Sequence, residues 1–230
     1  DDVSKVMYNN IKHTTVVLGS LIFLILSFNC RQPVIPTEED LAGYGWTLYE
    51  TGEYQEAREW FYDAVAKDTS YADGYNGIGW CFGKLRQADS AAVYFHVSQT
   101  KPFDPYDTPD LDLDLYAGLT FSYSGMHIDS LVRTYATYVL VERPELGAWY
   151  FSHDNKINHL DIRLELALAD FNMGYFVSCR NNLQSIYNDT YYQSFPSNNP
   201  KSLTMNVETV SGRAELAQIL QSLQQTLKNI

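Results

Sequence analysis

The chain has 230 residues, of which 45% are hydrophobic and 14% aromatic, and its 16 basic and 28 acidic residues give a formal charge of −12. This length and composition suit one folded domain, or at most two. The acidic balance argues against a nucleic-acid-binding protein and against electrostatic attachment to anionic lipid, because both require a basic surface.

The first recognisable element is an apolar run at residues 16–26, preceded by Lys12 and His13. The run is shorter than the roughly 20 residues that a membrane-spanning helix needs. It therefore predicts a secretory signal peptide over residues 1–29, with Met7 as the expected start. The alternatives are an uncleaved N-terminal anchor and a secreted protein that is cut elsewhere.

The end of this run, from Leu26 to Cys30, resembles a bacterial lipobox, in which a Leu and a small residue precede an acylated Cys. Leu26 and Ser27 fit the pattern, whereas Asn29 is larger than the usual Gly or Ala. The resemblance implies that Cys30 carries a lipid and that residues 30–37 form a tether. We expect a protein of the bacterial cell envelope, periplasmic or on the cell surface, most simply at the outer membrane, whose lipid is its only attachment to the membrane.

The remaining chain repeats itself. An offset of 34 residues pairs Gly45 with Gly79, Trp46 with Trp80, Ala57 with Ala91 and Phe61 with Phe95. These four coincidences of uncommon or size-restricted residues are hard to obtain by chance. The period and the spacing resemble the tetratricopeptide repeat, a pair of antiparallel helices with a Gly in the first helix and an Ala-x₃-Phe motif in the second.

The resemblance implies an all-α fold, a right-handed solenoid of about four helix pairs with a C-terminal capping helix. The helix-pair domain spans residues 38–230, with units expected at about 38–71, 72–105, 111–144 and 160–193 and the capping helix at 211–229. Gly52, Gly125 and Gly174 are expected to form the tight turns inside three pairs, whereas the second unit has Arg86 where the turn Gly belongs. The apolar spacing of the last segment predicts an amphipathic helix that covers the open end of the stack.

In this family the first helices of the pairs line a concave groove that binds a segment of another protein. The repeat positions that form this groove fall on Trp46, Tyr49, Asn76, Trp80, Tyr123 and Phe171. Aromatic residues exposed in a concavity are typical binding hot spots, so Trp46 and Trp80 are the sharpest candidates. The alternative is that both rings pack against neighbouring helices or the C-terminal helix.

The residues point to no catalytic site, metal site or cofactor. Nucleophile, phosphate-loop and zinc-protease motifs are absent, and the acidic run at residues 104–114 lacks the Gly and Glu of a calcium-binding EF-hand loop. The sequence therefore predicts a non-enzymatic scaffold or assembly factor, tethered to a membrane, that binds another protein. The alternative function is capture of a glycan or other small ligand, with Trp46, Trp80 and Trp149 as stacking platforms.

Overall fold

The computed structural model describes Met7 and residues 35–104, 110–141 and 148–228. The chain divides into two compact units at Pro36, and the second unit contains ten helices in its described part. They are α2 (Glu38–Glu50), α3 (Tyr54–Lys67), α4 (Ala72–Lys84), α5 (Ala88–Gln99), α6 (Leu111–Gly125), α7 (Asp129–Val141), α8 (His159–Asn172), α9 (Phe176–Asn188), α10 (Thr190–Gln193) and α11 (Val210–Leu227). No strand occurs there beyond an isolated bridge between Tyr150 and Asn158.

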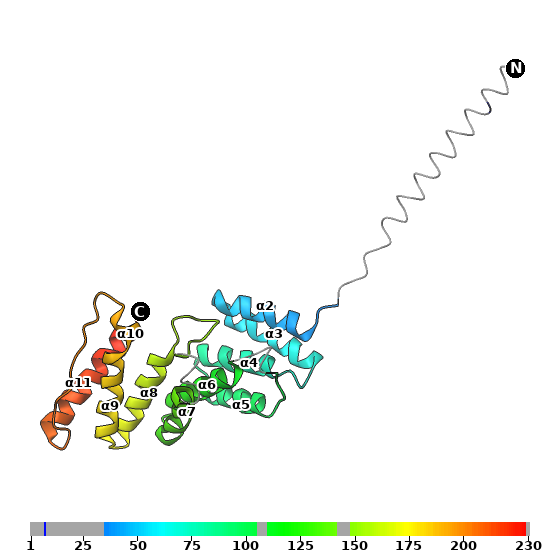
Figure 1. Ribbon diagram of the computed structural model, residues 1–230. Helices are drawn as coiled ribbons and strands as arrows, with labels where there is room; N and C mark the ends of the chain where they lie inside the picture. Colours follow the sequence, from blue (N-terminus) through cyan, green and yellow to red (C-terminus); the bar gives the residue numbers. More distant parts are fainter. Residues whose placement is uncertain (1–6, 8–34, 105–109, 142–147, 229–230) are drawn as a thin grey trace. The chain divides into compact units, whose positions relative to one another are not determined.

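The helices pack in consecutive pairs, α2 with α3, α4 with α5, α6 with α7 and α8 with α9, and each pair also packs against the next (Figure 1). The first helices α2, α4, α6 and α8 also contact one another in sequence, so they line one face of the stack. Helix α11 lies against α8 and α9. These contacts confirm the predicted all-α solenoid of four helix pairs and a C-terminal helix.

Two phenylalanines from second helices hold the first three pairs together. Phe61 of α3 lies between α2 and α4, where a Cβ added to Gly45 or Gly77 would be 3.0 or 2.4 Å from its ring. Phe95 of α5 lies between α4 and α6 in the same way, against Gly79 and Gly118. The repeated Gly and Phe therefore pack in the same way in both places, because glycines without a side chain leave room for a fully buried ring.

All four pairs turn through the same backbone motif. In each pair one residue has a positive φ, two positions after the end of the first helix. These residues are Gly52, Arg86, His127 and Gly174. In each case the N–H of this residue bonds the carbonyl three residues back, and the next N–H bonds the carbonyl five residues back, which is a Schellman motif. The expectation that Gly125 makes the third turn is wrong: His127 makes it.

The last helix pair and α11 share a second apolar cluster, to which the loop between α10 and α11 contributes Leu203, Met205 and Val207. The completely buried Asp170 of α8 links α7, α8 and α9. Its carboxylate accepts hydrogen bonds from Ser178 and Asn182 of α9 and pairs with Arg133 of α7.

Cys81 and Cys179 are buried free thiols, and burial raises the pKa of each to about 12, so both stay protonated as packing residues.

Candidate functional site

Four of the predicted groove residues are buried. Trp46 is 5% exposed and Trp80 is 4% exposed, and Tyr49 and Asn76 are still less accessible. All four lie on α2 or α4. The expectation that they form an open binding surface is therefore wrong for this structure, and the alternative, that the two tryptophans are packed, holds.

The cover comes from the chain itself. Residues 148–157, which precede α8 and which we call the closing segment, pack onto the face of α2 and α4. Phe151 is completely buried, and its ring stacks on Trp80 with the centroids 4.0 Å apart. The imidazole of His153 stacks on Trp46 at 3.8 Å with the two rings nearly parallel.

Polar contacts fix this closing segment at both edges. Asp154 pairs with Lys84 of α4 at 2.6 Å, and His153 Nδ1 lies 2.9 Å from Glu50 of α2. The indole N–H of Trp149 donates to the buried carboxylate of Asp114 on α6. Burial raises the pKa of Asp114, and this hydrogen bond opposes the rise.

The closing segment is also folded internally. The Phe151 N–H donates to the carbonyl of Ile157, and the His159 N–H donates to the carbonyl of Trp149. The bridge between Tyr150 and Asn158 lies between these bonds. Its own backbone hydrogen bonds hold the shape of the closing segment. The segment that covers the face of α2 and α4 is therefore an ordered part of the fold.

The other two predicted groove residues lie elsewhere. The hydroxyl of Tyr123 is 2.7 Å from His96 Nε2 of α5, and its ring stacks on Tyr135 of α7. Phe171 packs edge-on against Phe176 of α9. Both are half-buried contacts between helices.

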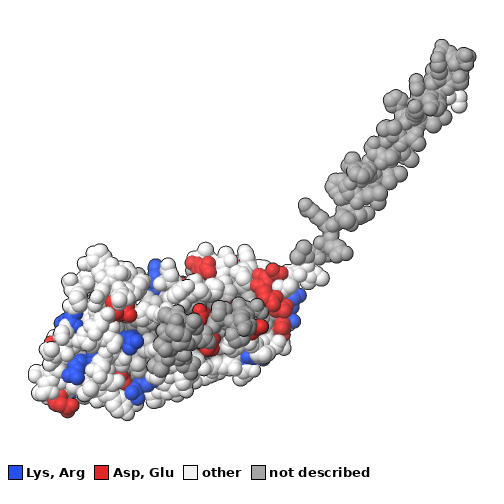
Figure 2. Space-filling model, viewed as in Figure 1, with Lys and Arg blue, Asp and Glu red and all other residues white. Residues whose placement is uncertain are grey.

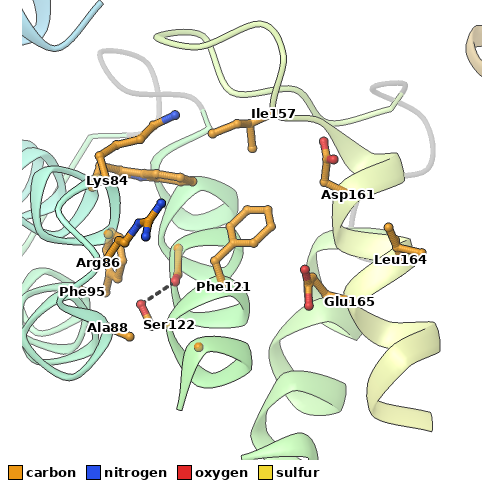
Figure 3. Close-up of a pocket in the computed structure, with 14 residues that line it drawn as sticks. Lys84, Arg86, Ala88, Phe95, Phe121, Ser122, Ile157, Asp161, Leu164 and Glu165 are labelled. Carbon is orange, nitrogen blue, oxygen red and sulfur yellow. Dashed lines mark hydrogen bonds between the residues drawn. The ribbon is translucent and has the colours of Figure 1, made fainter. Parts of the chain in front are cut away.

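One hollow in the face formed by the first helices lies over α4, α6 and α8. It is a cavity of about 500 Å³, and Figure 3 shows its labelled side chains, with Phe121 of α6 between the charged residues of α4 and α8. Its apolar lining includes Trp80, Phe95, Phe121, Ile157 and Leu164. We call this cavity the open pocket.

The two walls of the open pocket carry opposite charges. Lys84 and Arg86 stand at the end of α4, and Asp161 and Glu165 lie one turn apart on α8 (Figure 3). Burial raises the pKa of Asp161 to about 6, although its hydrogen bond with the Asn158 N–H opposes the rise. Burial also raises the pKa of Glu165, against the hydrogen bond from Ser124.

These two carboxylates are functional candidates that the sequence reasoning missed. Asp161 and Glu165 are four residues apart, and Leu164 and Leu168 lie on the same part of the helix, so helical spacing could have placed them on the groove face. Asp161 also has a structural role, because it completes a capping box with Asn158 at the start of α8.

A second cavity, of about 870 Å³, lies where α2, α4 and α6 meet the closing segment. Its lining is acidic and aromatic, and includes Glu39, Asp73, Tyr71, Phe103 and Asp114. Among the described residues, no three His, Cys, Asp or Glu side chains are grouped to hold a metal ion. The acidic run at 104–114 lies partly outside the described residues.

In the described part of the chain no helix is both long and apolar enough to cross a bilayer. The predicted signal peptide and Cys30 lie outside that part. Comparison of the chain with protein-family models, with curated proteins and with solved structures finds no match in any of the three.

Proposed function

We propose that this chain is a protein-binding scaffold or assembly factor, tethered by a lipid on Cys30 to the extracytoplasmic side of a bacterial envelope membrane. The observation that carries the binding role is the open pocket on the face of α4, α6 and α8. Helix-pair solenoids use their concave face for recognition, and here the pocket is partly aromatic and charged at its walls.

The partner is expected to be a peptide segment or helix of another protein. The half-buried Phe121 offers a large apolar contact of the kind from which hot spots are built, and the flanking charges supply orientation. Recognition by a preformed pocket needs no turnover chemistry, in keeping with the absence of catalytic motifs from the sequence.

Capture of a glycan on exposed tryptophans has lost its support. Trp46, Trp80 and Trp149 are each more than nine-tenths buried, so none offers a free ring face for stacking. The rings instead pack around Phe151, and Trp46 and Trp149 donate hydrogen bonds to Asp73 and Asp114.

A photoreactive phenylalanine analogue at position 121 tests the binding role in living cells. We expect a discrete crosslinked partner from position 121 and none from position 138, where Tyr138 is an exposed aromatic of α7 outside the pocket. Identical crosslinking patterns from both positions, or no crosslink from position 121, would contradict a partner in the pocket.

The anchor has its own test, because the formal charge of −12 gives the chain no net attraction to anionic lipid. Asp and Glu gather over α2 and α3 on the visible face in Figure 2. Such a face is repelled by anionic headgroups, so the lipid has to hold the protein alone. Cys30→Ser should move the protein from the membrane fraction to the soluble fraction, and persistence at the membrane would refute lipid anchoring.

A further inference from the structure

Within the described part of the chain, the carboxylates of the open pocket have no cationic partner. Glu165 accepts a hydrogen bond from Ser124 Oγ, and Asp161 accepts one from a backbone N–H. Among the described residues neither forms an ion pair with Lys, Arg or His. Burial of a carboxylate without a counter-charge is costly, and the raised pKa values of both groups express that cost.

The cations across the pocket do not fill this role. Lys84 is held by Asp154 of the closing segment at 2.6 Å, so its charge is already balanced. Arg86 is exposed at the end of α4, and Figure 3 shows it on the wall opposite Glu165. Neither is among the main causes of the pKa shift of Asp161 or of Glu165.

Apolar side chains line the open pocket together with the two carboxylates. Phe121 lies between the walls in Figure 3, and Leu164 of α8 and Ile157 line the same cavity. A long aliphatic side chain with a positive end suits this arrangement, because its methylene groups can cover the aromatic floor while its head reaches the carboxylates.

We propose that the open pocket recognises a lysine or arginine side chain of the partner, with the methylene groups on Phe121 and Leu164 and the cationic head between Asp161 and Glu165. This inference rests on the proposed protein-binding function and names the chemistry of the bound segment. The net charge of −12 adds a long-range attraction for a basic segment.

Selection from a displayed library of random peptides tests the recognition. Peptides selected on the full chain should be enriched in Lys or Arg next to apolar residues. Glu165→Gln should weaken a selected peptide at least about tenfold, because hydrogen bonds to charged groups are strong, whereas Glu215→Gln, at an exposed carboxylate of α11, should leave its affinity unchanged.

A change in the peptide provides a test that leaves the protein intact. Replacing the selected basic residue with norleucine, which keeps the aliphatic stem and removes the charge, should weaken binding by at least the same factor, because both carboxylates lose their partner. Equal affinity of the norleucine peptide, or selected peptides without enrichment in Lys or Arg, would overturn this inference while a peptide-binding pocket stands. A library that yields no binder at all would count against the proposed function as well.

Discussion

Replacing Phe151 with Ala should destabilise the fold more than most loop substitutions. The side chain is completely buried, stacks on Trp80, and meets Trp46 and Tyr49 edge-on, each at a centroid distance of 5.9 Å. Deleting a buried phenylalanine ring costs about 3–5 kcal/mol of unfolding free energy, and packed aromatic pairs add to its burial, so we expect a value in the upper half of that range.

Tyr150→Ala is the matched control, because Tyr150 is the neighbouring residue in the same segment and is 64% exposed. Its effect should stay within about 0.5 kcal/mol. Both variants are compared with the wild type by urea unfolding, followed by far-UV circular dichroism, with the slope of the transition unchanged. A loss below about 1 kcal/mol for Phe151→Ala would refute the conclusion that the segment is a built part of the fold.

Three further predictions concern the turns, the buried ion pair and the pocket. His127→Gly should raise the unfolding free energy by about 1 kcal/mol in thermal unfolding, because His127 holds a positive φ that glycine adopts without strain; a loss would argue against that turn. Asp170→Ala should lower it by about 2–4 kcal/mol in urea, less than for a fully buried pair because Arg133 is partly exposed; a neutral result would contradict the network. Because the pKa of Asp161 is raised in the folded state, the unfolding free energy of the wild type should fall relative to that of Asp161→Asn as pH rises from about 4 to 6. The same pH dependence of unfolding free energy in both proteins would contradict the raised pKa.

The helix pairs could be predicted because their packing depends on residues that are rare and size-restricted. Gly45 and Gly79 leave room for Phe61 and Phe95. The same packing requirement therefore recurs with the same residue types 34 positions apart. The turns were harder to predict. A positive φ favours Gly but does not require it, and Arg86 and His127 adopt it in the second and third turns.

The covered half of the groove could not be predicted from the repeat. Repeat positions say which residues face the concavity, but they do not show whether another part of the same chain fills it. Trp149, Tyr150 and Phe151 were a signal, since three consecutive aromatics are unusual in an exposed linker. The partners of Phe151 on α2 and α4 are about 70 to 105 residues away in the sequence, and no local pattern links the two regions.

Hydrogen exchange in the presence of the crosslinked partner tests the division of the groove most directly. Bound partner should slow amide exchange in α6 and α8 beside the open pocket, and should leave α2 and the closing segment Ala148–Ile157 unchanged. Faster exchange in the closing segment, together with new protection along α2, would contradict this result, because it would show that the partner displaces the segment and binds across Trp46 and Trp80.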